Sequence, residues 1–368
     1  MTQGSTLTDS NPDVSPSVWL LLDDRPGHSS QVIGLARYME WQATAIPLKF
    51  NFLNIFPNPL LGGSLLSLKT DCKAALIHDF PSVLVGMGRR TLPVARWIKK
   101  QSGSKTKIIM LGRKAIAGPA VIDLLISCVH FRQLPRAGLF ALAVPPTKID
   151  AAFLANLRDS APSPYQATVK RRVLVLVGGP TAQHVFSGPA AANMASALQI
   201  AADRIGGELT FLTSRRTPVD AVAAIKRTAP HAPINVWQAA NAKNPYLDYL
   251  AHADSIVVTG ESESMIAEAV ASKRPLTIYP LDEKPWRLKH NLAETIYAAA
   301  TGRGWGSGLA RRLLNNGWIV PVRDLDLMHQ TLQDRGQATI FGNTIAIAPP
   351  RETRELEHLK VRINRLLV

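Results

Sequence analysis

The chain has 368 residues, 46% of them hydrophobic and 19% charged, which excludes a disordered protein and provides enough apolar material for two cores. The formal net charge of +15 favours anionic partners such as nucleotide phosphates, nucleic acid or an anionic membrane face. No stretch reaches the roughly 18 uninterrupted apolar residues of a membrane span. The two cysteines, Cys72 and Cys128, have no metal-ligand spacing, so we expect free buried thiols in a reducing cytosol.

The chain begins with a polar stretch, residues 1–17, that lacks the basic start and long apolar core of a signal peptide. We interpret it as a short disordered lead. A first domain is expected over residues 18–150, because apolar strand-like runs there alternate with helix-like segments. The predicted strands are 18–22, 82–85, 107–111 and 123–128, and the predicted helices are 27–40 and 92–100. One face of the first helix carries Val32, Leu35, Ala36 and Met39.

Residues 151–170 have little strand pattern and end near an Ala-Pro-Ser-Pro run, so we interpret them as a linker. The alternating pattern then restarts, and it predicts a second domain over residues 171–335. The predicted strands are 173–177, 208–213, 234–237, 255–258 and 276–279, and the predicted helices are 189–205, 219–227, 245–252, 262–271 and 285–299. Residues 336–368 form a final loop and a basic amphipathic helix, 352–367, which can pack on either domain.

Strands separated by helices of 10–15 residues indicate βαβ units and parallel sheets. Two such series in tandem predict an α/β fold with two doubly wound, Rossmann-like domains that face a cleft. Ligands of such sheets bind beyond the carboxyl ends of the strands, so the loops that follow strands are the candidate binding loops.

The first such loop contains Asp23, Asp24, Gly27 and His28 between a strand and a helix. Gly27 permits a tight turn, and His28 at the cleft can take a proton from an acceptor hydroxyl. Asp23 or Asp24 can orient the imidazole or serve as the base instead. A turn with a capping side chain and a solvated histidine is the alternative interpretation. The loop lacks the GxGxxG pattern, so no dinucleotide cofactor is expected. His130 also follows a strand, but no clear helix comes after it.

The second loop, on the expected acceptor side, contains Gly86, Gly88, Arg89 and Arg90. Its glycines let the backbone approach a ligand, and its arginines offer donors to phosphate or carboxylate. Residues 89–114 include nine Lys or Arg and no Asp or Glu. This run predicts a docking surface for an anionic lipid headgroup or a phosphorylated acceptor, with a solvated basic face as the alternative.

The third and fourth loops follow the first two strands of the second domain. Gly178, Gly179 and Thr181 offer backbone N–H groups and a hydroxyl, which suit a diphosphate. The next loop adds further hydroxyl and guanidinium donors at the end of a strand. These donors are Ser214, Arg215 and Arg216.

The most informative loop, Gly260 to Ser264, opens a helix that also carries Glu268. A helix N-terminus with Ser262 and Ser264 is suited to phosphate, and a carboxylate four residues after Ser264 can accept bonds from both ribose hydroxyls. An ordinary capping box followed by an amphipathic helix is the alternative. Two acids in this loop, Glu261 and Glu263, repel phosphate unless they point away.

The segment TGESESMIAEAVASKRP resembles the signature of the mitochondrial fission Elm family. The segments DDRPGHSSQVIGLA, VGMGRRTLPVARWIK, VLVGGP and TSRRTP are similar to that family's other motifs and occur in its order. The resemblance spans about residues 19–322. Bacterial members are regarded as glycosyltransferases similar to GT-B enzymes, such as the lipid-linked N-acetylglucosaminyltransferase of peptidoglycan synthesis. A plant branch recruits a fission dynamin.

The resemblance implies roles for four residues. In the GT-B enzyme, a loop after the first strand meets the acceptor, which suggests His28 for that role. A serine-rich loop and a helix with a glutamate hold the nucleotide there, which suggests Ser262, Ser264 and Glu268. The first loop here reads DDRPGH, not the doubled-glycine loop of that enzyme, so the base stays open among His28 and the two aspartates.

The leading hypothesis is therefore a cytoplasmic glycosyltransferase, peripheral on the inner membrane. It would move a sugar from a nucleotide-sugar to an envelope lipid or saccharide acceptor, with an anionic membrane surface as partner. GT-B enzymes generally need no bound metal, and we expect neither a metal nor a cofactor. The alternatives are a nucleotide-sugar epimerase of the same fold and a non-catalytic, membrane-associated scaffold of the fission-factor type. No recognition helix, RNA-binding or zinc pattern supports nucleic-acid binding.

Overall fold

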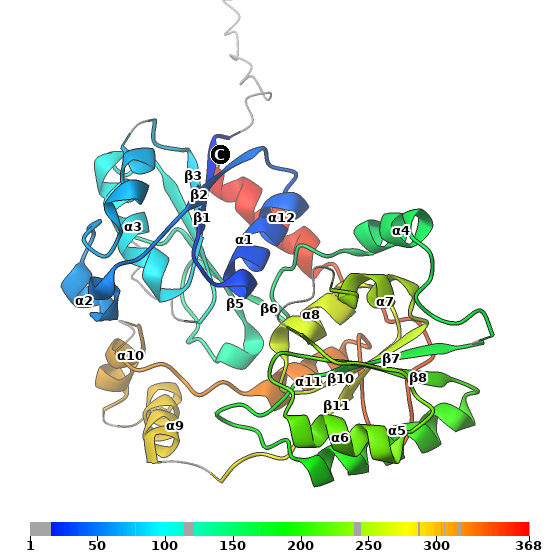
Figure 1. The fold of residues 1–368 in the computed structure, drawn as a ribbon. Helices are drawn as coiled ribbons and strands as arrows, with labels where there is room; N and C mark the ends of the chain where they lie inside the picture. The colour runs from blue at the N-terminus through cyan, green and yellow to red at the C-terminus, as the bar shows by residue number, and fades with distance from the viewer. Residues whose placement is uncertain are drawn as a thin grey trace, which may run out of the picture.

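The computed structural model describes residues 16–367 except for residues 78, 114–120, 169, 239–243, 286–287, 303, 305 and 316–317. The lead predicted over residues 1–17 lies almost wholly outside the described residues, as does the last residue of the basic run. Within the described part, two parallel sheets of six strands each form the framework of the molecule (Figure 1).

The first sheet has the strand order β2-β1-β3-β4-β5-β6, and every pair is parallel. Its strands are β1 Val18–Leu22, β2 Ala43–Pro47, β3 Val83–Met87, β4 Lys107–Leu111, β5 Leu124–Cys128 and β6 Leu139–Leu142. The four central strands were predicted. The two edge strands, β2 and β6, were not predicted. Both are partly exposed, and β2 lacks a continuous apolar run, whereas β6 lies in the apolar run Leu139 to Val144 and was readable from the sequence.

Alternate residues of the central strands pack into two separate cores, one on each face of the first sheet. One core joins the strands to α3, Gly88–Gln101, through Leu92 and Ile98. The other joins them to α1, Pro26–Tyr38, and to α12, Glu355–Leu367. The face of the first helix predicted from the sequence is confirmed, since its four apolar side chains are at most 5% exposed.

The second sheet has the order β12-β11-β10-β7-β8-β9, again entirely parallel. Its strands are β7 Arg172–Val177, β8 Glu208–Thr213, β9 Ile234–Asn235, β10 Ser255–Thr259, β11 Leu276–Tyr279 and β12 Thr339–Ile340. One face is covered by α5 Gly188–Arg204 and α6 Val219–Thr228. The other is covered by α4 Ala151–Ser160, α7 Tyr246–His252, α8 Glu263–Ala271 and α11 Leu325–Asp334.

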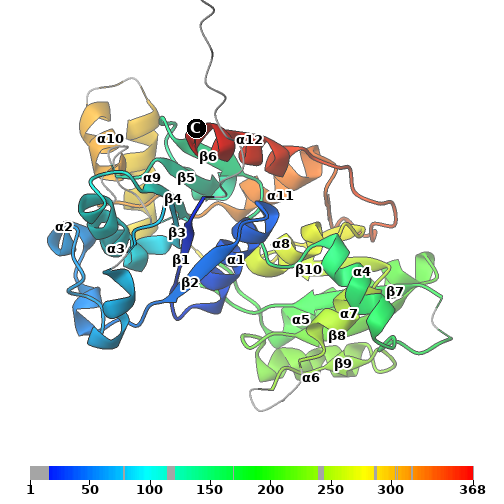
Figure 2. The same ribbon diagram turned by 90° about the horizontal axis from the view of Figure 1, so that it is seen from above.

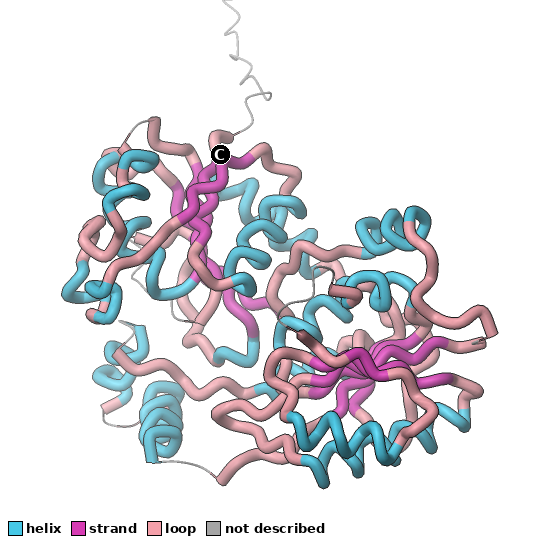
Figure 3. Tube along the Cα trace, viewed as in Figure 1, coloured by secondary structure: helices cyan, strands magenta, loops and turns pink. Residues whose placement is uncertain are grey.

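Both sheets are therefore doubly wound, and the predicted α/β fold class with two Rossmann-like domains, the arrangement called GT-B, is confirmed (Figure 3). The segment expected to be a linker contains α4, whose Leu154 joins the core of the second domain. Both cysteines are free and buried, as predicted. No helix in the described part of the chain is long and apolar enough to cross a membrane.

Two late segments of the chain pack on the first domain. Helices α9 Leu288–Thr301 and α10 Ser307–Asn315 share a small core with Leu134. Helix α12 lies beside α1 in both ribbon views (Figures 1 and 2), and its Leu359 and Ile363 are fully buried in the core around α1. The C-terminal helix thus belongs to the first domain, a choice that the sequence left open.

Short helices fill the segment between β2 and β3. They are η1 Phe52–Ile55, α2 Asn58–Leu61, η2 Thr70–Cys72 and η3 Ala74–Leu76, and η4 Val129–Phe131 follows β5.

Candidate functional site

Each sheet has one point where successive connections leave in opposite directions, and the candidate loops lie there. In the first sheet this switch point lies between β1 and β3, and in the second between β7 and β10. The loops at the carboxyl ends of these four strands are where a doubly wound fold binds its ligand.

A histidine–aspartate pair occupies the switch point of the first sheet. Nδ1 of His28 lies 2.7 Å from Oδ2 of Asp23, whose side chain is 1% exposed against 23% for the imidazole. The other oxygen, Oδ1, accepts the N–H of Arg25 at 3.1 Å, and the Ser29 hydroxyl donates to the Asp23 carbonyl. A carboxylate at Nδ1 selects the tautomer with its hydrogen on that atom, so Nε2 carries the lone pair that can accept a proton.

The imidazole of His28 packs against the backbone of Gly88 in the loop after β3. Gly88 has φ +78°, and a β-carbon there would come within 3.1 Å of Cε1 of His28. The left-handed conformation favours glycine at this position, and the ring makes the space for a β-carbon tight. Gly86, the other predicted glycine, is buried within β3 under Thr91 and Met110.

Three further charged residues of these two segments, Asp24, Arg89 and Arg90, are engaged with protein groups. Asp24 pairs with Arg90 at 2.6 Å on the exposed side of the loop. The guanidinium of Arg89 donates to the carbonyls of Phe56 and Asn54, so it ties η1 to α3. His28 and Asp23 are therefore brought together, whereas Asp24 and Arg89 point elsewhere.

At the switch point of the second sheet, a buried carboxylate lies where the sequence suggested a diphosphate. The N–H of Gly179 donates to Oε1 of Glu261 at 2.9 Å, and the N–H of Gly178 donates to the Thr259 hydroxyl at 2.8 Å. A β-carbon on Gly178 would overlap the Glu261 carboxylate. Burial raises the pKa of Glu261, although the Gly179 and Thr259 bonds and Arg216, at 3.5 Å, oppose the shift. From the sequence we expected Glu261 to repel phosphate unless it pointed away from the site.

Two hydroxyl residues of the predicted donor loops shape those loops. The hydroxyl of Thr181 accepts the N–H groups of Gln183 and His184 at 3.1 and 3.0 Å. The Ser214 hydroxyl accepts the N–H of Arg216 at 3.2 Å. Arg215 is exposed beside it.

The start of α8 faces the first domain. Ser262 precedes the helix and is 6% exposed, and its side chain makes no capping hydrogen bond. Ser264 is exposed, and its hydroxyl lies 4.0 Å from the position of a β-carbon on Gly27. The ring of His329 contacts Gly260, and its Nε2 lies 2.8 Å from the carbonyl oxygen of Gly260. The histidine loop and the serine-led helix therefore meet across the two domains.

Glu268 lies beside a pocket at the carboxyl ends of β8 and β9. Its Oε2 accepts the Tyr246 hydroxyl at 2.5 Å, and burial raises its pKa. The pocket has a volume of about 370 Å³, within the range of small-molecule sites. It is lined by Leu176, Leu212, Thr213, Ser214, Arg215, Asn235, Val236, Trp237, Gln238, Asn244, Pro245, Tyr246 and Met265.

Sequence reasoning found Ser214 and Arg215 in this lining but missed the aromatic residues Trp237 and Tyr246. Trp237 follows the two-residue strand β9, and Tyr246 begins α7. Both residues come after β9 and before β10, so their place after the end of a strand was the available signal.

Ion pairs between the domains complete the site. Glu263, the first residue of α8, lies 3.1 Å from Nε2 of His130 and 3.2 Å from Nη1 of Arg323. Burial raises the pKa of Glu263, but His130 and Arg323 more than offset this and lower it. Arg132 contacts both carboxylate oxygens of Glu294 at 2.7 and 2.8 Å, which ties α9 to the first domain on which it packs.

Comparisons with known proteins give one family and two curated relatives. The family model described as "Mitochondrial fission ELM1" matches residues 26–304. An uncharacterized protein of Rickettsia prowazekii is 26% identical over 296 residues, 72% of this chain and 83% of that protein. The mitochondrial fission protein ELM1 of Arabidopsis thaliana is 27% identical over 233 residues, 57% of this chain. The chain spans about half of that plant protein, 54% of its length.

Several solved structures are similar at low identity. MurG of Acinetobacter baumannii is 13% identical with a TM-score of 0.40, covering 95% of this chain and 100% of that one. The glycotransferase of kitacinnamycin is 12% identical with a TM-score of 0.47, covering 96% and 90%. Phytolacca americana UGT2, complexed with UDP-2fluoro-glucose and pterostilbene, is 10% identical with a TM-score of 0.38, covering 96% and 94%. The fold assignment rests on the two sheets and their strand order.

Proposed function

The chain belongs to the mitochondrial fission ELM1 family, as its motifs indicated, and from this premise we propose that it is a glycosyltransferase. It transfers a sugar from a nucleotide-sugar to a lipid or saccharide acceptor of the cell envelope, at the cytoplasmic face of the inner membrane. The diphosphate is held by protein groups without a metal ion.

One observation carries this proposal: the Asp23–His28 pair, whose loop faces the serine-led start of α8 in the other domain. In the reaction, Nε2 of His28 takes the proton of the acceptor hydroxyl, and the oxygen of that hydroxyl bonds to the anomeric carbon of the sugar. The bond from that carbon to the diphosphate breaks, and the nucleoside diphosphate leaves. Asp23 stabilises the imidazolium that forms, and the start of α8 stabilises the negative charge that develops on the diphosphate.

The donor's nucleoside half is assigned to the 370 Å³ pocket, where Trp237 and Tyr246 offer aromatic surface to a base. Because Tyr246 occupies Oε2 of Glu268, the ribose is assigned to Oε1. The diphosphate is assigned to the space among the donor loops. Those donors are Gly178, Gly179, Thr181, Arg215, Arg216, Gly260, Ser262 and Ser264. A diphosphate at Gly179 requires the Glu261 carboxylate to leave that N–H.

The acceptor side is assigned to an anionic membrane surface through the segment 52–66. Arg89 and Arg96 hold this segment against α3 by bonds to its carbonyls, so these two arginines do not form the solvated basic face considered from the sequence. The segment exposes several large apolar side chains, which is unusual for a surface in water. They are Phe52 at 81%, Ile55 at 83%, Leu60 at 73% and Leu66 at 59%. Exposed Lys49 and Lys69 flank them; Lys69 complements anionic headgroups, whereas Lys49 is paired with Asp71 at 3.2 Å.

Sedimentation with anionic vesicles tests the membrane assignment. The double substitution Phe52→Ser and Ile55→Ser should abolish binding at low salt. Val219→Ser, which changes an 86% exposed side chain in the second domain, should leave it intact. Equal binding of both variants would contradict the assignment.

A nucleotide-sugar screen tests the enzymatic proposal. A donor at 100 times its dissociation constant should stabilise the protein by about 2.7 kcal/mol. Trp237→Ala should lose this stabilisation, whereas Trp318→Ala, which removes an exposed tryptophan outside the pocket lining, should keep it. The stabilising donor should then release nucleoside diphosphate in the presence of an envelope lipid fraction. Binding without release would favour the scaffold function.

A further inference from the structure

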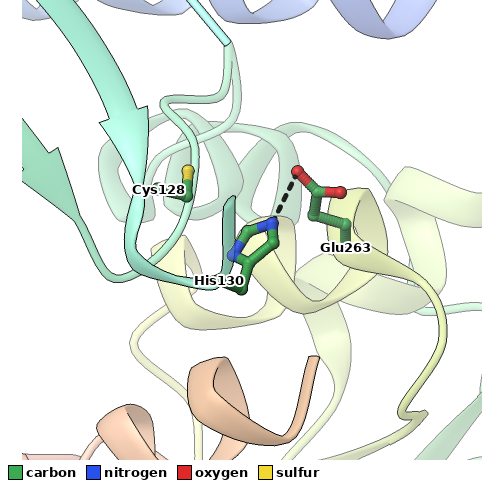
Figure 4. A group of neighbouring side chains, drawn as sticks. All are labelled: Cys128, His130 and Glu263. Carbon is green, nitrogen blue, oxygen red and sulfur yellow. Dashed lines mark ion pairs between the residues drawn. The ribbon is translucent and has the colours of Figure 1, made fainter. Parts of the chain in front are cut away.

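Three metal-ligating side chains from both domains meet at the end of β5. Cys128 is the last residue of β5, His130 lies in η4, and Glu263 is the first residue of α8. Their candidate ligand atoms, Sγ, an imidazole nitrogen and a carboxylate oxygen, all lie within 4.8 Å of one another. Figure 4 shows the three side chains gathered between the end of β5 and the start of α8.

The histidine of this cluster is buried without normal hydrogen bonds. His130 is 0% exposed, and neither ring nitrogen has a hydrogen-bond partner among the described residues. Nε2 lies 3.1 Å from Oε1 of Glu263, close enough for an ion pair but without hydrogen-bond geometry. A buried imidazole without a well-aligned hydrogen bond is costly, and a lone pair on an imidazole nitrogen is a metal ligand.

We propose that Cys128, His130 and Glu263 form a transition-metal site that joins the two domains and takes Zn²⁺ or an ion of similar preference. One sulfur, one nitrogen and one oxygen ligand suit Zn²⁺, whereas Mg²⁺ and Ca²⁺ prefer oxygen ligands alone. Bonds of 2.0–2.3 Å in a tetrahedral site place ligand atoms about 3.5 Å apart. The separation of His130 Nε2 from Glu263 Oε1 is already 3.1 Å, so binding mainly requires the Cys128 sulfur to approach the other two ligands.

The charges at this point include two anionic ligands and two nearby cations, Arg323 and Arg113, both of which act on Glu263. A Cys128 thiolate and the Glu263 carboxylate together supply two negative charges, and binding displaces the thiol proton into solvent. Arg323 donates to Oε2 of Glu263 at 3.2 Å, which leaves Oε1 directed at the ion and fixes the carboxylate from behind. The backbone N–H of Asp324 holds the His130 carbonyl at 2.8 Å, so one segment braces both ligands.

A metal bound here would act as a clamp between the domains. Two ligands come from the first domain and one from the second. The coordination of the ion is therefore complete only when α8 lies close to the end of β5. This role is independent of the proposed glycosyl transfer, which needs no metal at the diphosphate. The site is therefore tested by metal binding alone.

Cobalt(II) titration of the chelator-treated, reduced protein tests the site, because Co²⁺ replaces Zn²⁺ and reports a thiolate ligand by a near-ultraviolet charge-transfer band. We expect about one Co²⁺ bound per chain, the thiolate band, and the visible bands of a four-coordinate ion. Excess Zn²⁺ should remove all of these bands, and Mg²⁺ should not.

Matched cysteine variants locate the ligand. Cys128→Ser should lose the thiolate band, while Cys72→Ser, which changes the other buried thiol, should retain it. Glu263→Gln and His130→Asn should weaken Co²⁺ binding at least about tenfold. Circular dichroism of the metal-free variants separates lost ligation from lost folding, and Glu263→Gln, partly exposed at a helix start, is the variant least expected to unfold. Absence of a thiolate band in the folded wild type, or its persistence in Cys128→Ser, would overturn the proposal.

Discussion

The two switch points occupy the same place in two similar sheets, yet they are built for opposite partners. In the first, a glycine of the neighbouring loop makes room for the His28 imidazole, and buried Asp23 fixes its orientation. In the second, Gly178 makes room for the Glu261 carboxylate, and the backbone N–H of Gly179 donates to it. One point presents a proton acceptor, and the other is shaped around an anion.

The difference teaches that topology selects the position of a site but not its chemistry. Both loops follow the first strand of their sheet and precede a helix, so the fold alone does not distinguish them. In the first domain the segment after β1 itself supplies His28 and Asp23, whereas in the second domain the neighbouring loop after β10 supplies Glu261. In the second domain that side chain is itself an anion, which marks the place where a substrate anion would compete.

The largest expected effect concerns the first switch point. His28→Ala should lower turnover by roughly 10²–10⁴-fold, because a positioned general base contributes that much. Donor affinity should hardly change, since the donor loops belong to the other domain. Nucleoside diphosphate release gives turnover, and thermal stabilisation gives affinity. Asp23→Asn should cause a comparable loss of turnover through the wrong tautomer.

The control for this prediction is His231→Ala, which removes an exposed histidine of the second domain and should leave turnover unchanged. Full activity in the His28 variant would mean that an aspartate is the general base. Both switch points would then present a carboxylate, and the difference between them would disappear.

A smaller effect, on stability, compares glycines of the two loops. A β-carbon on Gly179 would lie 2.1 Å from the backbone carbonyl oxygen of Arg216, so Gly179→Ala should destabilise the fold by about 1–3 kcal/mol. Gly27→Ala meets only the Ser264 hydroxyl at 4.0 Å, and it gains helix propensity, so its change should stay within about 1 kcal/mol. Denaturant unfolding measures both. Equal values would mean that the second loop is not tightly fitted.

The smallest effect is a pH dependence at Glu261, whose pKa burial raises in the folded protein. Between the ordinary pKa and the raised one, the folded state binds more protons than the unfolded state. Stability therefore falls as pH rises through that window, with a limiting slope of about 1.4 kcal/mol per pH unit. Glu261→Gln should remove this part of the slope, so the stability of the variant relative to wild type should increase with pH. Parallel curves would show that Glu261 titrates alike in both states.

Much of the fold was predictable because the central strands are continuous apolar runs separated by helix-period patterns. The edge strand β2 was missed because it lacks such a run, whereas β6 lies in the apolar run Leu139 to Val144 and was readable from the sequence. Helix α3 begins at Gly88 rather than Leu92, and it contains Pro93, a residue that usually marks a helix start.

The candidate site was predictable only in part. Loops at strand ends identified His28, Ser264 and Arg215, because their positions follow from the order of elements. The pairing of Glu263 with His130 was not predictable, since it depends on how two separately folded sheets dock. The engagement of Glu261 by Gly179 was missed for a related reason: only the second sheet's strand order brings their loops together.

Helix α12 has a consequence for the order in which the protein is made. Its Leu359 and Ile363 complete the core around α1, and Glu355 accepts the N–H of Ala143 and pairs with Arg335. A ribosome therefore produces the first domain before the second, but that domain lacks one of its covering helices until residues 355–367 emerge. During translation the apolar face around α1 stays uncovered while the whole second domain is synthesised. The domain that starts first is the last to be finished, and chaperones would have their longest access to that face.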